Sequence, residues 1–351
     1  MTGAARRRDL SSRAERGICS TAAGGPRGKA ARFAWGERRA WPGRSLRLLL
    51  VGAALLVLPA SAHAQRERPD RRLQRELEAL TRDFHGGVGV YVHHLRTGAV
   101  AAIQADDTFP TASMIKVPIM VGVFDAMAAG KFAFTDTAPE PRAVAKYPED
   151  DILAGLSDTA RITVSRLLTL SLTYSDNSAS LWLQQLAGTG TAINGWLERH
   201  GFAVTRVNAR TPGREADYDA WGWGQTTPRE MAELLTLIRQ GKVVSPAASE
   251  EMYRTLTRSF WTGEALSQLP PTVQAASKQG AVDRSRSEAV LVNAPSGDYV
   301  FCVITKNQQD TTWTPANEGY VLLRRVSALL WRYFEPKHPW TPAPGAERFK
   351  P

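Results

Sequence analysis

Cysteine is scarce in this chain, which has 2 cysteines in 351 residues. Cys19 lies in an Arg-rich N-terminal stretch, so Cys302 is alone in the 351 − 64 = 287 residues that follow residue 64. A lone cysteine cannot form an internal disulfide, which excludes the small folds held together by several such bonds. The fold must therefore rest on a hydrophobic core, and a 43% share of hydrophobic residues can supply one.

An excess of positive charge is also lacking once the N-terminal stretch is set aside. The formal net charge is +10, but residues 1–64 hold 12 Lys and Arg against 3 Asp and Glu, a balance of +9. The remainder holds 44 − 12 = 32 basic and 34 − 3 = 31 acidic residues, a balance of +1. Binding to a nucleic-acid backbone needs clustered positive charge, so we expect no nucleic-acid partner.

Long apolar runs are rare, and the clearest one is too short to cross a bilayer. Residues 48–58 are apolar, follow Arg44 and Arg47, and lead to the small-residue sequence Ala62-His63-Ala64. A bilayer span needs about 20 apolar residues, whereas a basic flank, a short apolar core and an A-x-A exit are typical of a secretory signal peptide. We predict a leader over residues 1–64, cleavage after Ala64, a secreted, periplasmic protein, and no membrane span after cleavage.

The rest of the chain, 65–351, is predicted to be one α+β domain. Alternating apolar residues predict strands at both ends of it, within segments 85–105 and 277–335, and the last segment ends in a helix near 316–334. Between them, about 110–276 has a mostly helical pattern. This order predicts an antiparallel sheet built from both chain ends, flanked by helices, with a central all-helical lobe.

The first motif that carries chemistry is Ser113-Met114-Ile115-Lys116. Positions i and i+3 of a helix share a face, so the Ser113 hydroxyl and the Lys116 amine are expected to meet. Pro118 lacks an amide hydrogen and fits only if the helix begins at or just before Ser113. Taken alone, the pattern is common and also fits an ordinary surface helix.

Two further motifs follow along the chain. Ser175-Asp176-Asn177 follows an apolar segment, although these residue types also suit a simple helix cap. Lys278-Gln279-Gly280 begins a predicted strand, where a glycine lets a substrate lie close to the backbone. Each motif is weak alone, but their order within a strand–helices–strand layout is specific.

Together the three motifs resemble the signature of class A β-lactamases and, more broadly, of the penicillin-recognising serine hydrolases that include DD-peptidases. The resemblance spans about residues 73–334 and implies the β-lactamase/transpeptidase-like fold. It implies that Ser113 is the acylated nucleophile and that Lys116 accepts its proton. It also implies that Ser175 relays a proton to the leaving nitrogen, and that Asn177 orients Lys116 and the substrate.

The resemblance further implies how the substrate is held. Lys278 and Arg286 are expected to attract carboxylates, and Gly280 lets the substrate approach. The backbone amides of Ser113 and Ala281 are expected to form the oxyanion hole. We expect no metal and no organic cofactor, a β-lactam or a peptidoglycan-type peptide as the substrate, and a monomer.

Two departures from the family pattern stand out. Gln279 replaces the Thr or Ser that usually follows the lysine of the third motif. The Glu-x-x-Leu-Asn sequence, whose glutamate activates the deacylating water in class A enzymes, is absent before Thr226. Glu215, Asp217 and Asp219 are candidate replacements, with Glu215 preferred, although all three also suit an exposed loop.

These departures leave three hypotheses open. The first, which we favour, is a secreted class A β-lactamase-like hydrolase that opens β-lactam rings through an acyl-enzyme on Ser113. The second is a DD-peptidase-like amidohydrolase acting on peptidoglycan peptides. The third is a sensor domain that is acylated by a penicillin and releases the acyl group slowly.

Overall fold

The computed structural model describes residues 67–138, 151–156 and 161–349. The predicted leader, with its apolar core at 48–58 and its cleavage site after Ala64, lies outside the described residues. Within the described part, no helix is both long and apolar enough to pass through a bilayer.

A six-stranded sheet joins the two ends of the described chain, in the order β1-β3-β2-β9-β8-β7. Its strands are β1 (Arg68–Pro69), β2 (Gly87–His94), β3 (Ala99–Ile103), β7 (Ala275–Val282), β8 (Ser285–Val292) and β9 (Tyr299–Lys306). All neighbouring strands are antiparallel except β1, which pairs in parallel with β3. Pairing of β2 with β9 confirms that both chain ends build one sheet.

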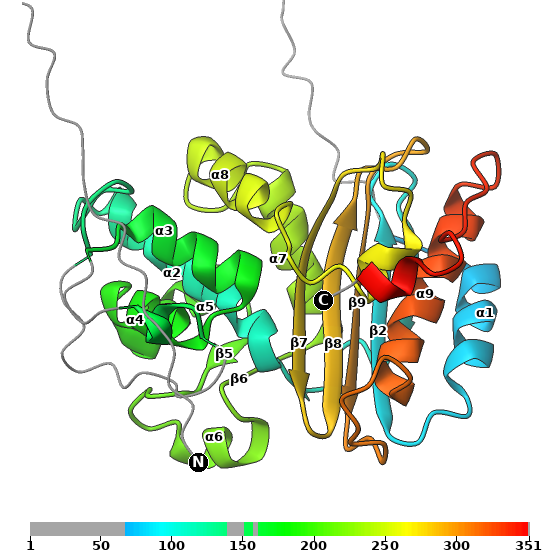
Figure 1. Cartoon of the computed structure of the whole chain (residues 1–351), viewed down its shortest axis with the longest axis horizontal. Coiled ribbons are helices and arrows are strands. Elements are labelled where there is room, and N and C mark those ends of the chain that lie inside the picture. The colour runs from blue at the N-terminus through cyan, green and yellow to red at the C-terminus, as the bar shows by residue number, and fades with distance from the viewer. Residues whose placement is uncertain (1–66, 139–150, 157–160, 350–351) are drawn as a thin grey trace, which may run out of the picture. The chain divides into compact units, whose positions relative to one another are not determined.

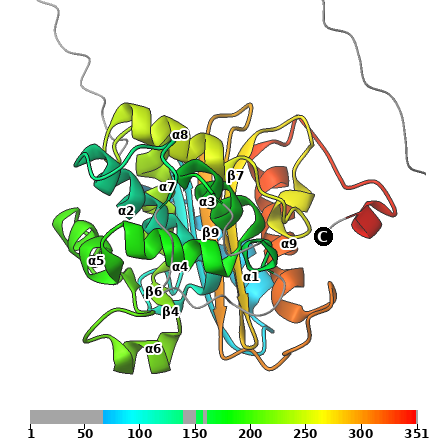
Figure 2. The ribbon, with the colours of Figure 1, turned by 60° about the vertical axis from the view of Figure 1, so that its left-hand side comes forward.

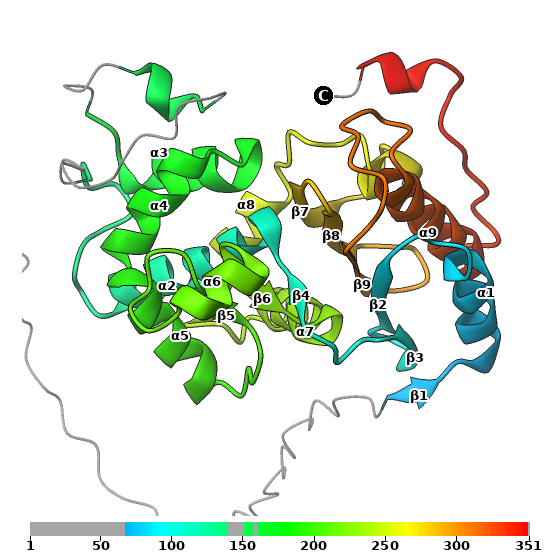
Figure 3. The same cartoon turned by 90° about the horizontal axis from the view of Figure 1, so that it is seen from below.

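Helices cover both faces of this sheet (Figures 1 and 3). On one face, α1 (Arg71–Thr81) and α9 (Glu318–Phe334) bury Leu73, Leu77 and Val326 against the sheet. The other face carries α7 (Pro228–Arg239), and a second apolar cluster extends from it into the central segment of the chain. The sheet is therefore buried on both sides, and β8 is buried at every position.

The central segment holds most of the helices, as predicted. They are α2 (Lys116–Ala128), α3 (Val164–Thr169), α4 (Asn177–Leu186), α5 (Thr189–Arg199), α6 (Glu215–Trp221), α7 and α8 (Pro246–Leu256), with short turns η1 (Ala112–Ile115), η2 (Leu153–Gly155) and a π-helical turn, η3 (Leu170–Tyr174).

The prediction of an all-helical lobe was wrong in one respect. A small sheet of β4 (Phe109–Pro110), β6 (Gly224–Thr226) and β5 (Arg206–Val207) lies within the central segment, and Figure 2 shows α6 next to it. Strands of two or three residues are too short to show an alternating pattern, so the sequence carries no signal for them. This sheet connects the segment before Ser113 to the segment after α6.

Candidate active site

Ser113 lies in the turn η1, directly before α2 begins at Lys116. Pro118 is therefore the third residue of α2, where an amide hydrogen has no partner within the helix, and the proline costs little. Ala112 has a φ of 44°, in the left-handed region that non-glycine residues rarely adopt. Strain of this kind is typical of functional sites, because the surrounding structure must hold it in place.

Lys116 is fully buried and connects three side chains that the sequence predicted to meet. Its Nζ lies 3.1 Å from the Ser113 Oγ, 3.0 Å from the Ser175 Oγ and 2.8 Å from the Asn177 Oδ1. It also donates to the Ser175 carbonyl oxygen. The hydroxyl of Ser113 and the amine of Lys116 are thus in direct contact.

The second motif serves as a helix cap and as part of the site at the same time. Asp176 caps α4 by accepting a hydrogen bond of 2.7 Å from the Ala179 amide. Ser175, just before it, has a φ of 66°, and both its oxygens accept from Lys116. The interpretation as a helix cap therefore holds for Asp176, and the interpretation as part of the site holds for Ser175.

Asp151 is part of this arrangement and had no signal in the sequence. Its carboxylate accepts hydrogen bonds from the amides of Asn177 and Ser178, at 2.9 and 2.7 Å. A carboxylate is stabilised at the N-terminus of a helix, which explains its position at the start of α4. A lone aspartate in a loop cannot be distinguished from a surface charge before the fold is known.

Lys278, on β7, also contacts the Ser175 hydroxyl, which Lys116 contacts as well. Its Nζ donates to the Ser175 Oγ at 3.0 Å and to the Gln279 Oε1 at 2.6 Å. The Gln279 side chain thus accepts a hydrogen bond from the Lys278 ammonium, which the family resemblance predicts to bind the substrate carboxylate. A carboxylate must displace or share this amide to reach Lys278.

Gly280 is required where β7 passes η1. A Cβ built at this position would lie 2.6 Å from the Thr111 carbonyl oxygen and 2.9 Å from the Ser113 amide nitrogen. Any larger residue forces β7 away from η1. The close packing brings Ala281, the next residue, to the same cleft as Ser113.

Burial sets the protonation of both lysines. It lowers the pKa of Lys116 to about 7, against a smaller opposing effect of the Asp151 and Asp176 carboxylates. It also lowers the pKa of Lys278 well below its usual value, and the nearby Lys116 ammonium adds to this shift. An amine with a pKa near neutrality can accept a proton from a hydroxyl, so the geometry is suited to activating Ser113.

Two tryptophans line the cleft beside Ser113. This cavity of about 470 Å³ includes Ser113, Asn177, Ala281, Trp221 and Trp223 among its lining residues. The Trp223 ring lies 5.9 Å from the Lys116 Nζ. Both tryptophans therefore border the space in which a substrate of Ser113 would lie.

The structure contradicts the prediction that Arg286 is a carboxylate anchor. Arg286 is 0% exposed and donates to the carbonyl oxygens of Val282, Ser285 and Thr312. Its guanidinium lies 4.4 Å from the Trp313 ring and 4.7 Å from the Tyr320 ring of α9. Arg286 points to the α9 face of β8, because it alternates with the residues that face the cleft.

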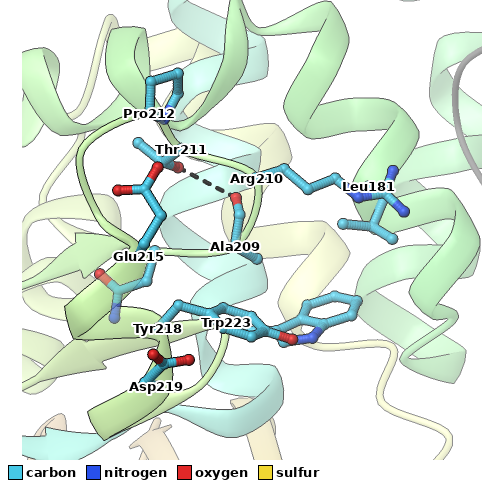
Figure 4. Close-up of a pocket in the computed structure, with 10 residues that line it drawn as sticks. Leu181, Ala209, Arg210, Thr211, Pro212, Glu215, Tyr218, Asp219 and Trp223 are labelled. Atoms are coloured by element: carbon cyan, nitrogen blue, oxygen red, sulfur yellow. Dashed lines mark hydrogen bonds between the residues drawn. The ribbon is translucent and has the colours of Figure 1, made fainter.

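Glu215 also lies elsewhere than predicted. It lines a neighbouring cavity of about 560 Å³ together with Thr211, Pro212 and Asp219, and only Trp223 lines both cavities. Figure 4 shows its carboxylate turned toward Thr211 and Pro212, and its Oε1 accepts from the Gly213 amide at 3.1 Å. Glu215 is the first residue of α6, and this bond ties its carboxylate to the turn that precedes the helix.

Comparison with known proteins agrees with this architecture. The family described as the β-lactamase enzyme family (Beta-lactamase2) matches residues 72–334. A β-lactamase of Streptomyces fradiae is 26% identical over 293 residues, covering 80% of this chain and 92% of that protein. A β-lactamase of Mycobacterium tuberculosis is 25% identical, covering 74% and 88%.

Solved structures show the same fold. The structure of PBP-A superimposes with a TM-score of 0.68 at 26% identity, covering 77% of this chain and 98% of PBP-A. The β-lactamase of Sphaerobacter thermophilus gives a TM-score of 0.66 at 22% identity, covering 76% and 98%. The fold and the serine–lysine site define a β-lactamase-like serine hydrolase. The chain belongs to the β-lactamase enzyme family.

Proposed function

We propose that this protein opens β-lactam rings by forming an acyl-enzyme on Ser113. The observation that carries the proposal is the continuous contact from Ser113 through Lys116 and Ser175 to Lys278. Relatives named as β-lactamases support it. A structure of a PBP-A mutant described as an acyl-enzyme complex with penicillin G, 26% identical to this chain, supports it further.

The acylation step follows from the positions of these groups. Neutral Lys116 accepts the Ser113 hydroxyl proton while the Oγ bonds to the lactam carbonyl carbon. The carbon–nitrogen bond then breaks, Ser175 donates its proton to the leaving nitrogen, and the Lys116 ammonium returns a proton to Ser175. The amides of Ser113 and Ala281 hold the oxyanion meanwhile, and Asn177 keeps Lys116 oriented.

Release of the acyl group depends on a different base from the one that the sequence suggested. No carboxylate lines the cleft of Ser113 in the described part of the chain. The Lys116 amine, in contact with Ser113, is then the group placed to activate the water. The acylation relay leaves Lys116 neutral, but no carboxylate of the described residues lines the cleft to assist it, so we propose slow release.

The second candidate is a DD-peptidase-like amidohydrolase acting on peptidoglycan peptides. The specific observation in its favour is this lack of a cleft carboxylate, together with the likeness to PBP-A. A sensor that retains its acyl group differs from it only in the rate of release. In each case we propose an exported, periplasmic monomer.

One experiment distinguishes these functions. The purified protein is mixed with a chromogenic cephalosporin, and both the colour change and the intact mass are followed. Continuous turnover supports the β-lactamase, whereas one stoichiometric burst with a lasting adduct supports the sensor. Absence of an adduct, with release of terminal D-alanine from a peptide, supports the peptidase.

Two variants test the assignment of the nucleophile. Ser113→Ala is expected to abolish the adduct completely, because among the described residues only the Ser113 hydroxyl both contacts Lys116 and belongs to a residue of the oxyanion site. The matched control is Ser296→Ala, at the turn before β9, whose hydroxyl contacts His94 and not the cleft. An adduct on the Ser113→Ala protein contradicts the proposal.

A further inference from the structure

The cleft beside Ser113 continues to a second pair of basic residues. Along its length it is lined by residues before Ser113, by the end of α6 with the residues that follow it, and by the turn between β7 and β8. Its charged lining residues, within the described part of the chain, are Arg284 and Lys306. A cleft with charge of one sign raises the local concentration of ligands of the opposite sign.

Lys306 is a cation without a counter-ion. It ends β9, and its partly buried Nζ donates to the Thr108 carbonyl oxygen at 2.9 Å and lies 4.2 Å from the Phe109 ring. No carboxylate of the described residues lies within 4.0 Å of it. An ammonium has three donors, so two remain for a ligand.

Arg284 lies beside it in the turn between β7 and β8. Its NH2 donates to the Asn307 carbonyl oxygen at 3.3 Å, which links this turn to the residue that follows Lys306. Asp283, its neighbour in the turn, is exposed and does not line the cleft. The rest of the guanidinium is available to a ligand, and its fork matches a carboxylate.

These two cations lie on the opposite side of Ser113 from Lys278. Gly280 of β7 packs against the Ser113 amide, Lys278 comes two residues earlier, and Arg284 comes four residues later. A strand advances about 3.3 Å per residue, so the chain from Lys278 to Arg284 runs past the nucleophile. A substrate held at Ser113 thus has a basic group near each of its ends.

We propose that Arg284 and Lys306 form a second anion subsite, which binds a carboxylate carried by the acyl portion of the substrate. This inference rests on the proposed function, because it concerns a β-lactam bound at Ser113. Lys278 remains available for the carboxylate on the ring that carries the leaving nitrogen. The preferred substrates then carry two acidic groups, one on each side of the reacting carbonyl.

Two penicillins that differ by one carboxylate test this subsite. Benzylpenicillin and its analogue with a carboxylate on the acyl side chain, carbenicillin, are compared by their second-order rates of acylation at low salt. Changing Lys306→Gln or Arg284→Gln is expected to lower the carbenicillin-to-benzylpenicillin rate ratio about fivefold, the size expected for a partly exposed charge pair. Lys306→Arg is expected to retain the wild-type ratio.

The control variant is Lys337→Gln, an exposed lysine after α9, which is expected to leave both rates unchanged. An unchanged ratio in both cleft variants overturns the subsite. Calorimetric binding of the same two compounds to Ser113→Ala measures the preference without acylation. A wild-type protein that neither forms an adduct nor turns over a penicillin therefore overturns the proposed function, whereas equal binding of the two compounds overturns the subsite.

Discussion

Lys116 and Lys278 are two buried amines that share one hydroxyl, that of Ser175. Two positive charges this close in a buried place repel each other strongly, so at least one amine is favoured in its neutral form. The neutral form is the one that can accept a proton from Ser113. The reactivity of the Ser113 hydroxyl thus depends on the burial of the neighbouring Lys116 amine.

Acylation is therefore expected to depend on pH. Because burial lowers the pKa of Lys116 to about 7, the amine is protonated and inactive well below pH 7 and neutral above it. The second-order acylation rate should rise about tenfold per pH unit below 7 and then level off. Intact mass measured from pH 5 to pH 9 checks this, with Lys337→Gln as the control. A flat profile contradicts the role of Lys116.

Glu215 is a residue whose replacement is expected to have little effect on the reaction. Its carboxylate lines the cavity next to the cleft and accepts from the Gly213 amide, and Glu215 is not among the lining residues of the cleft of Ser113. Glu215→Gln is expected to change the rate of acyl release less than about twofold, as for surface changes away from a site. Decay of the adduct mass measures it. A tenfold slower release restores Glu215 as the base.

At the scale of the element, β7 carries Lys278 of the site, and its Ser277 contacts a buried carboxyl group, that of Glu288. Glu288 on β8 is almost fully buried and accepts from the Ser277 Oγ at 2.6 Å and the Ala265 amide at 2.8 Å. Burial raises the pKa of Glu288 to about 7. This group holds β7 to β8 directly behind Lys278.

The sign of the resulting pH dependence follows from linkage. The pKa of Glu288 is higher in the folded protein than in the unfolded chain, so its protonated form favours folding. This contribution to stability is complete below about pH 4.5 and is lost as the pH rises through about 7. In Glu288→Gln the amide oxygen can accept from the Ala265 amide and the NH2 can donate to the Ser277 Oγ, as a protonated carboxyl group would. This variant is expected to raise the free energy of unfolding at pH 8 by about 1–3 kcal/mol.

Denaturant unfolding at pH 5 and pH 8 measures this effect. The matched control is Glu250→Gln, which removes an exposed ion pair with Arg254 and is expected to change the stability by less than about 0.5 kcal/mol at either pH. A loss of stability in Glu288→Gln at pH 8 shows that the carboxylate is the favoured form and contradicts the prediction.

On the scale of the whole molecule, stability comes from two apolar clusters, one on each face of the sheet. Cys302 lies in the cluster on the cleft side, is 0% exposed and pairs in register with Tyr91 and Ala289. Burial in this apolar place raises the pKa of the Cys302 thiol, so the reactive thiolate is disfavoured.

A thiol reagent therefore reports on global unfolding. In a Cys19→Ser protein, Cys302 is expected to react at least about 100-fold more slowly in buffer than in denaturant, because core groups are exposed only by cooperative opening. Absorbance with a chromogenic thiol reagent measures both rates. Reductant should leave the melting temperature unchanged. Rapid labelling in buffer contradicts the role of this cluster as a stable core.

Sequence by itself determined most of the layers and which motifs to place together. The order of Ser113-x-x-Lys116, Ser175-Asp176-Asn177 and Lys278-x-Gly280 resembles that of the penicillin-recognising serine hydrolases, and this resemblance predicted the contacts that are observed. The strands at both ends and the central helices followed from residue periodicity. The helix predicted near 316–334 is observed as Glu318–Phe334.

Tertiary structure alone decided which way several of these residues face and how they titrate. β8 is buried at every position, so no alternation of polarity reveals that Arg286 points to α9 and not to the cleft. Glu215 and Asp151 both look like surface charges in the sequence. Only the fold shows that Asp151 binds the start of α4 beside the site, whereas Glu215 lines the neighbouring cavity. The pKa of Lys116 likewise depends on burial by residues far apart in the chain, which no local pattern encodes.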